Sequence, residues 1–430
     1  MNKKLFAFIV LLAIIFPVNF LKSPNFIALI GILFVCIASI RSKNYTIPVL
    51  MLLTLIPAQL NDDLVLSYNI NRSFYYLILS FCLFLFCIKY RLKIRHRPLL
   101  IFIFIISFFY AFNNSREEID YVLIFICYLY IGQILSENED MGIKEFLNFV
   151  DIIFFIVAIY GIMEFIFRTS PYQDLYRYEW IGDMRIKGLL GHPLMLSGFM
   201  SIYILYLYTR ILLLKQIPTI QIIIAIVLVL LTASRTCYLL IALSFIIFLF
   251  YSNMSAFKRI GSIILICVLL IIVNSYLNEY TTQSFERISE SSNSITNRWA
   301  AIDVAIDVFL NNLFGVGAIG FSNEIKSGYN ISSNFEIKVL DNNYLYFLVS
   351  YGLFSIPFIW YLINPIVTIK KNVTSRNHKC LVIIISTIWF LLPFSFIISI
   401  YPHILFMFSC LIGKIKKELD NGYISNTCKL

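Results

Sequence analysis

Long apolar segments recur along almost the whole chain, and most are separated by short polar connections. The hydrocarbon core of a bilayer is about 30 Å thick, and a helix needs about 20 mainly apolar residues to cross it. The pattern predicts an all-α fold, a polytopic membrane helix bundle of about 12–14 transmembrane helices with one large extracytoplasmic loop. The apolar segments are 5–21, 26–40, 46–60, 73–88, 98–112, 119–135, 146–167, 192–209, 219–233, 236–252, 260–276, 342–363, 381–397 and 399–413.

The composition excludes a soluble globular protein. Hydrophobic residues make up 60% of the 430 residues, and only 13% are charged. Soluble domains are about 45–50% apolar and about 25% charged, so these residues could not form a water-exposed surface. We therefore expect residues 1–430 to form a single membrane domain.

The positive charges predict how the chain is oriented. Most lysines and arginines fall in alternate connections, beginning with Lys3 and Lys4 and including the connection with Arg210 and Lys215, as expected for the cytoplasmic side of a membrane protein. No small-residue cleavage site follows the first apolar segment, which we expect to be the first membrane helix. Both termini are then cytoplasmic, with 414–430 as a cytoplasmic tail. The net charge of +10 therefore reflects topology, and we expect no nucleic-acid partner.

Two longer connections fall on the outer side in this scheme, a first one at 168–191 and a large one at 277–340. The large loop contains a segment beginning at Trp299 in which Asp303 and Asp307 are spaced i, i+4 among apolar residues. This spacing predicts a helix on the outer rim of the bundle, ending at Asn311–Asn312. The sequence shows no internal duplication of the kind found in many transporters.

Polar residues that could support chemistry gather at the predicted outer side. Each has an ordinary structural alternative: an arginine can extend to the interface or be solvated in a loop, a polar residue before a helix can cap it, and a histidine can be structural. The candidates are Arg235 in the turn between two apolar segments, Arg298 just before Trp299, Asp341, Asn342 and Tyr344 where the large loop meets a new helix, and Arg185 and His192 before the eighth segment.

Together these residue types suit a phosphorylated lipid substrate. Guanidinium groups bind phosphate oxygens in a bidentate manner and stay charged when partly desolvated. A carboxylate beside them can act as a general base towards a hydroxyl group. The four histidines are dispersed and the nine cysteines show no metal-ligand spacing, so we expect no metal and no cofactor.

Four short motifs resemble the O-antigen ligase/polymerase superfamily of bacterial membrane proteins, which includes the Wzy-type polymerases. They occur in the family's order, within residues 185–353. They are Thr232-Ala-Ser-Arg235; Arg298-Trp299 followed by Asn312-Leu-Phe-Gly315-Val-Gly317 and Phe321; Asp341-Asn-Asn-Tyr344-Leu followed by Gly352-Leu353; and, more faintly, Arg185, Gly188 and His192-Pro193.

This resemblance implies an all-helical enzyme that transfers a glycan from undecaprenyl diphosphate without a metal. It implies catalytic roles for Asp341, Arg298 and Arg235, with the two arginines holding the diphosphate. Arg185, Asn342, His192 and Tyr344 would bind substrate. In ligases of the family the position of Asp341 is typically histidine. The aspartate therefore favours a polymerase.

The resulting hypothesis is a polymerase of O-antigen or capsular repeat units in the bacterial cytoplasmic (inner) membrane. Its substrates would be undecaprenyl-diphosphate-linked oligosaccharides at the periplasmic face, and a flippase and a chain-length regulator would act beside it. Two alternatives stay open: a ligase that transfers glycan to lipid A core, and a flippase or other transporter without enzymatic activity.

Overall fold

The computed structural model describes the chain mainly from residue 132 onward. The described residues are 51, 105, 128–129, 132–138, 141–167, 186, 188–190, 193–232, 234–253, 255, 259–261, 263–264, 292–317, 342–370, 375–394 and 402–427. Within these ranges the structure is helical, with no β-strand.

Ten α-helices and three short 3-10 turns form the part of the chain described in full. They are α8 (Gly132–Asn138), α9 (Ile143–Phe167), η3 (Gly188–Leu190), α10 (Pro193–Leu213), α11 (Thr219–Thr232), α12 (Arg235–Tyr251), α15 (Ser292–Asn311), α17 (Asn343–Tyr351), η4 (Gly352–Phe354), α18 (Ser355–Lys370), α19 (Arg376–Leu391), η5 (Leu392–Phe394) and α20 (Pro402–Thr427).

Four helical segments in this part of the chain are long and apolar enough to cross a membrane: Ile143–Phe167, Pro193–Leu213, Asn343–Lys370 and Arg376–Phe394. They coincide with apolar segments predicted from the sequence. Helices α11 and α12 are shorter apolar helices, and they lie where two further spans are predicted. The predicted class, an all-α polytopic membrane protein, is confirmed. Most of the first six predicted segments and of 260–276 lies outside the described residues.

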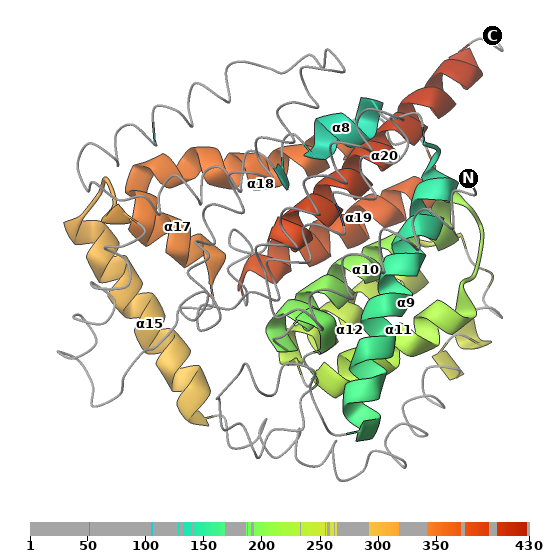
Figure 1. Ribbon diagram of the computed structural model, residues 1–430. Helices are drawn as coiled ribbons and strands as arrows, with labels where there is room; N and C mark the ends of the chain where they lie inside the picture. Colours follow the sequence, from blue (N-terminus) through green and yellow to red (C-terminus); the bar gives the residue numbers. More distant parts are fainter. Residues whose placement is uncertain are drawn as a thin grey trace, which may run out of the picture.

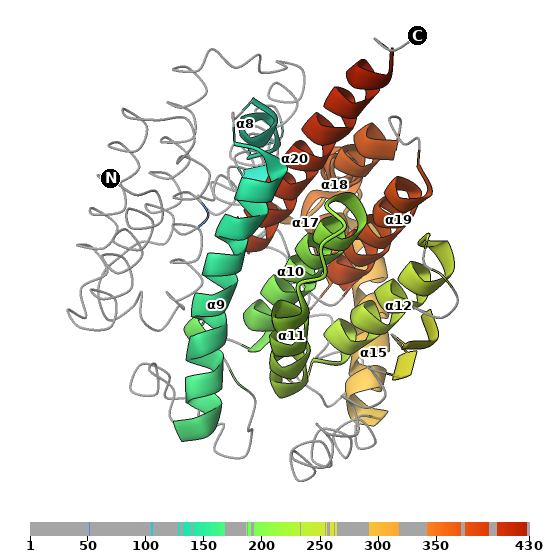
Figure 2. The same ribbon diagram turned by 90° about the vertical axis from the view of Figure 1, so that its right-hand side faces the viewer.

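Helix α10 lies at the centre of the bundle and is buried along nearly its whole length. It contacts α9, α11, α12, α19 and α20, and Figures 1 and 2 show these helices around it. Aromatic residues fix two of these contacts. The ring of Tyr203 stacks on Phe154 of α9 with centroids 3.9 Å apart, and the Tyr206 hydroxyl donates to the Met407 carbonyl of α20 at 2.7 Å.

The outward faces of the helices expose large apolar side chains. Phe167, Phe250 and Trp360 are each more than half exposed. A water-soluble protein rarely leaves so many large apolar groups uncovered, whereas lipid tails solvate them without penalty. The buried faces are also apolar, so these helices are hydrophobic on both sides, as expected for helices that face protein on one side and lipid on the other.

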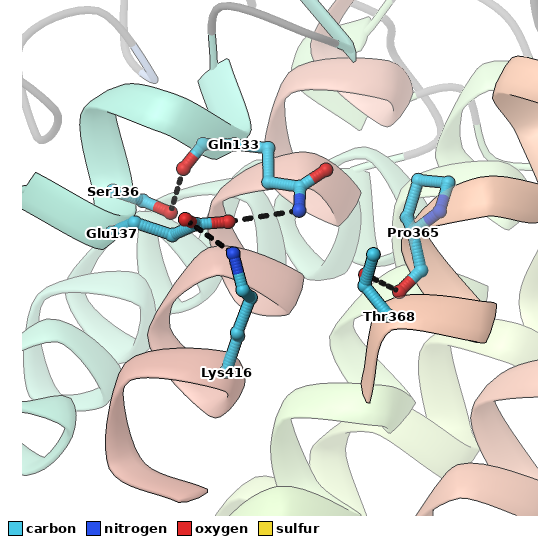
Figure 3. Close-up of polar contacts among 6 residues, drawn as sticks. All are labelled: Gln133, Ser136, Glu137, Pro365, Thr368 and Lys416. Carbon is cyan, nitrogen blue, oxygen red and sulfur yellow. Dashed lines mark hydrogen bonds and ion pairs between the residues drawn. The ribbon is translucent and has the colours of Figure 1, made fainter. Parts of the chain in front are cut away.

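Helix α20 packs along the short helix α8, and small residues let the two backbones approach closely. A Cβ added to Gly413 would collide with the Ser136 hydroxyl, and one added to Gly132 would collide with that of Ser409. Beside this contact Glu137 accepts hydrogen bonds from Gln133 at 2.9 Å and from Lys416 at 2.7 Å, as Figure 3 shows. Helix α20 continues unbroken through most of 414–430, the predicted tail.

The alternating directions of the helices give the bundle two distinct ends. At one end α9 and α11 begin and α10 and α12 end; we call this the charged end, defined by Asp151, Arg210, Gln221, Arg376 and Lys414. At the other end α9 and α11 end and α10, α12 and α17 begin; we call this the motif end, defined by Glu164, Gly188, Leu231, Asn342 and Tyr344.

Three details differ from the sequence-based prediction. The segment 342–363 is interrupted at Gly352, where α17 ends and a 3-10 turn leads into α18. Arg210 was assigned to a cytoplasmic connection, but it is buried in α10 and paired with Asp151. Helix α15 begins at Ser292, so Arg298 lies within the helix instead of just before it.

Candidate functional site

The end of the first longer loop packs onto the ends of α9 and α11 at the motif end. The backbone N–H of Ile186 donates to the Leu231 carbonyl at 3.2 Å, and that of Gly188 donates to the Glu164 carboxylate at 2.5 Å. Ile186 and Leu190 are buried. This short segment is therefore fixed between α9, α10 and α11, although it belongs to a polar connection.

Arg235 is the first residue of α12. This position agrees with the prediction that it lies at the turn between two apolar segments. Ser234 precedes it as the N-cap, in an extended conformation and with no side-chain capping hydrogen bond. The Tyr238 hydroxyl donates to the Leu230 carbonyl at 2.8 Å and so ties the start of α12 to the end of α11. The backbone of Arg235 is thereby held at the motif end.

Asn342 and Tyr344 begin α17 at the motif end. The Asn342 side-chain oxygen accepts hydrogen bonds from the backbone N–H groups of Tyr344 at 3.0 Å and Leu345 at 3.2 Å, which makes it the N-cap. The Tyr344 hydroxyl donates to the Phe390 carbonyl of α19 at 3.0 Å. Both side chains thus have structural partners, as the capping alternative predicts for Asn342.

A backbone contact joins the segment after α15 to the end of α17. The N–H of Leu353 donates to the Leu313 carbonyl at 2.9 Å, and the N–H of Val316 donates to the Val349 carbonyl at 3.1 Å. Gly315 and Gly352 have positive φ angles of 87° and 53°, and a Cβ on either would collide with the backbone of the opposite segment. We call this contact, formed by 313–316 and 349–353, the glycine clip.

The glycine clip explains why two motifs far apart in the sequence each contain glycine. Leu313-Phe314-Gly315-Val316 and Gly352-Leu353 were quoted separately for the family resemblance, and in the fold they bind one another. The clip attaches α15, the helix that contains Arg298, to α17, which Asn342 caps. Figure 1 shows one end of α15 meeting α17.

The described part of α15 is amphipathic, as predicted. Ala305 and Val308 are buried, whereas Asp303 and Asp307 are exposed together with the apolar Ile306. The helix ends at Asn311, as predicted. Its exposed face mixes carboxylates with apolar groups, which suits a helix at a membrane surface.

Some of the predicted site residues lie at the same end of the bundle, and others lie outside the described residues. It places the start of α12, with Arg235, and the start of α17, with Asn342 and Tyr344, at the same end of the bundle. Arg185, His192 and Asp341 lie outside the described residues, as do the side chains of Arg235 and Arg298. That the two guanidinium groups meet at one diphosphate stays a prediction.

Two carboxylates in α9 that the sequence motifs do not include are prominent in the structure. Asp151 is buried at the charged end. It pairs with Arg210 at 2.9 Å and accepts hydrogen bonds from Tyr203 at 2.9 Å and Gln221 at 3.4 Å. Glu164 binds the Gly188 N–H at the motif end. Both lie inside the apolar segment 146–167, and an ionisable residue inside a membrane span is itself a signal of function or of a buried partner.

Among the residues that the structure describes, no three His, Cys, Asp or Glu side chains are grouped as ligands for a metal ion.

A comparison with known families bears on these motifs directly. Residues 220–358 match the family model described as O-antigen ligase. The match places this segment in the O-antigen ligase/polymerase superfamily and confirms the resemblance found in the three motifs that it includes. The fainter motif from Arg185 to Pro193 lies before it. No curated protein and no solved structure matches the chain.

The matched segment of this O-antigen ligase family runs from the start of α11 to the first residues of α18. It includes Arg235, Arg298 and Asp341, and also both halves of the glycine clip. Members of the family are glycosyltransferase-like enzymes of membranes. Within the matched segment, the starts of α12 and α17 lie at the motif end of the bundle.

Proposed function

We propose that the protein is a polymerase that joins undecaprenyl-diphosphate-linked oligosaccharide repeat units into O-antigen or capsular polysaccharide at the periplasmic face of the inner membrane. The observation on which this rests is the family match over 220–358, which includes Arg235, Arg298 and an aspartate, Asp341, where ligases of the family typically have histidine.

The proposed reaction is a glycosyl transfer without a metal. The acceptor hydroxyl oxygen forms a bond to the anomeric carbon of the donor glycan, and the bond from that carbon to the diphosphate oxygen breaks. Asp341 takes the hydroxyl proton, and the polyprenyl diphosphate leaves. Arg235 and Arg298 stabilise the negative charge that develops on the leaving diphosphate.

The architecture supports this assignment of roles. Arg235 and Asn342 begin helices at the same end of the bundle, and the glycine clip couples the Arg298-containing helix to α17. A shared end is what an electrostatic site needs, because charged groups stabilise a leaving diphosphate only if the fold holds them in place beforehand.

A ligase is the second candidate, because the matched family model is itself described as O-antigen ligase. Deleting the gene distinguishes the two functions in a strain that makes lipopolysaccharide. Loss of a polymerase leaves lipid A core with one repeat unit, whereas loss of a ligase leaves the core bare. A bare core would overturn the proposal in favour of the ligase.

Elongation by the purified protein tests the enzyme itself. With lipid-linked repeat units and no ion gradient or added metal, we expect products of two or more units. Arg235→Ala and Arg298→Ala should each lower the rate at least about 100-fold, the scale of losing one electrostatic group of a transition state. Lys144→Ala, an exposed cation at the charged end, is the matched control. Normal elongation by both arginine variants would contradict the proposal.

A further inference from the structure

Glu164 occupies an unusual position for a carboxylate. It lies near the end of α9, in a helix long and apolar enough to span a membrane, and it is only partly exposed. Its Oε2 accepts the hydrogen bond from the backbone N–H of Gly188, the first residue of η3. A hydrogen bond to an ionised acceptor is about twice as strong as a neutral one. The carboxylate therefore holds a loop segment to α9.

A close approach of backbones reinforces this attachment. Gly161, one turn before Glu164, is buried against Gly188, and a Cβ added to it would lie 3.0 Å from Leu228 and 3.3 Å from Ile186. The lack of a side chain at Gly161 thus lets α9, the loop segment and α11 meet at one point. Glu164 is the charged group beside that point.

The same loop segment binds the end of α11. Ile186 donates its N–H to the Leu231 carbonyl at 3.2 Å, and Leu231 is four residues before Arg235. Hydrogen bonds to Gly188 and from Ile186 therefore connect the Glu164 carboxylate, through the loop backbone, to the Leu231 carbonyl just before the turn at which α12 begins. The sequence neighbours of this segment, Arg185 and His192, were both predicted to bind substrate.

We propose that Glu164 is a positioning residue for the lipid-diphosphate donor, acting through the loop segment 186–190 on the turn that presents Arg235. It touches neither substrate nor reacting atoms. This inference rests on the proposed function, because Arg235 is the group whose placement it serves. Loss of the carboxylate weakens donor binding more than it slows the chemical step.

The test compares Glu164→Ala with Glu164→Gln in the purified elongation assay with lipid-linked repeat units. The Gln side chain keeps an oxygen that can accept the Gly188 N–H, whereas Ala has none. We expect Glu164→Ala to raise KM for the donor about tenfold, equivalent to about 1.4 kcal/mol of binding, with kcat within about twofold of the wild-type value. Glu164→Gln should restore most of the loss.

A second variant perturbs the same contact and leaves the carboxylate in place. Gly161→Ala puts a methyl group against Ile186 and Leu228, and we expect it to raise the donor KM in the same direction. Glu145→Ala, an exposed carboxylate at the other end of α9, is the matched control and should leave both constants unchanged.

The outcomes separate this inference from the proposed function. If Arg235→Ala abolishes elongation but Glu164→Ala changes only the yield of folded protein, with an unaltered KM, Glu164 is merely structural and the inference fails. An equal loss in the Gln and Ala variants would also overturn it, because the hydrogen bond would then not be the cause. If Arg235→Ala and Arg298→Ala both elongate normally, the proposed function fails instead.

Discussion

The two ends of the bundle are held together by different kinds of contact. At the charged end, side-chain cations bind protein groups: Arg210 pairs with Asp151 at 2.9 Å, and Arg376 donates to the carbonyls of Tyr251 and Phe250, both at 3.1 Å. The last contact places a positive charge at the C-terminus of α12, where the helix dipole favours it.

At the motif end most of the described hydrogen bonds use at least one main-chain group. They include the bond from Ile186 to Leu231, the bond from Gly188 to Glu164 and the cap of α17 by Asn342. The glycine clip, at the opposite end of α17, is also a main-chain contact. When main-chain groups hold a site in place, its charged side chains do not have to stabilise the fold and can serve the reaction. From this difference we expect variants at the charged end to lower the stability of the folded protein. We expect variants at the motif end to lower activity more than stability.

Removing the buried cation of the charged end should have the largest effect on stability. Arg210→Met leaves Asp151 buried without its ion pair, and breaking such a pair typically costs about 3–5 kcal/mol. We expect a large fall in the thermal unfolding midpoint in detergent and in the amount of protein in the membrane. The specific activity of the protein that does fold should stay within about twofold of the wild type.

The double variant Asp151→Asn/Arg210→Met sharpens this prediction. It removes both charges, so it should be more stable than Arg210→Met alone. A wild-type midpoint for the single variant would show that the pair does not stabilise the bundle, and the contrast between the two ends would be wrong.

Disrupting the glycine clip should have the next largest effect. Gly352→Ala forces an alanine into a positive φ, which costs about 1–3 kcal/mol, and its Cβ meets the Leu313 carbonyl. Because the clip attaches α15 to α17, elongation should fall further than the amount of folded protein. Gly142→Ala is the control, since a Cβ there meets nothing within 4 Å. Loss of folded protein and of activity in equal proportion would reduce the clip to a purely structural contact.

Much of the fold could be predicted from the sequence, because membrane helices are set by the length and apolarity of single segments. The segment 146–167 needs no knowledge of its neighbours to be recognised, and α9 confirms it. The break at Gly352 was not predicted. It depends on the approach of residues 313–316, which are far away in the sequence and become visible only in the fold.

The candidate site was predicted less completely, for a related reason. Family motifs identified Arg235, Arg298 and Asp341, and the match over 220–358 confirms the motifs that contain them but not the roles of these residues. Glu164 lies before the matched segment and acts through a backbone N–H, so no pattern of residue types could connect it to Gly188. Arg210 was assigned to a cytoplasmic connection, because the sequence does not show that a cation near a helix end has a buried ion-pair partner.

The smallest predicted effect compares two helix caps, one at each end of the bundle. Asn342→Ala removes the side-chain oxygen that accepts from Tyr344, and Ser375→Ala removes the hydroxyl that accepts from the His378 N–H at 3.1 Å at the start of α19. Each loss should cost about 1 kcal/mol of stability. Asn342→Asp retains a capping oxygen and places a negative charge at a helix N-terminus, so its unfolding midpoint should match the wild type.

Activity then separates the two roles open to Asn342. If it only caps α17, Asn342→Asp should elongate lipid-linked repeat units normally, and Asn342→Ala should resemble Ser375→Ala, with activity following the folded fraction. If it also orients the acceptor hydroxyl through its amide group, Asn342→Asp should be fully folded yet slower by about tenfold. Measuring the midpoint and the elongation rate on the same preparations decides between these outcomes. A loss of activity in Ser375→Ala that exceeds its loss of folded protein would mean that the two ends do not differ in function.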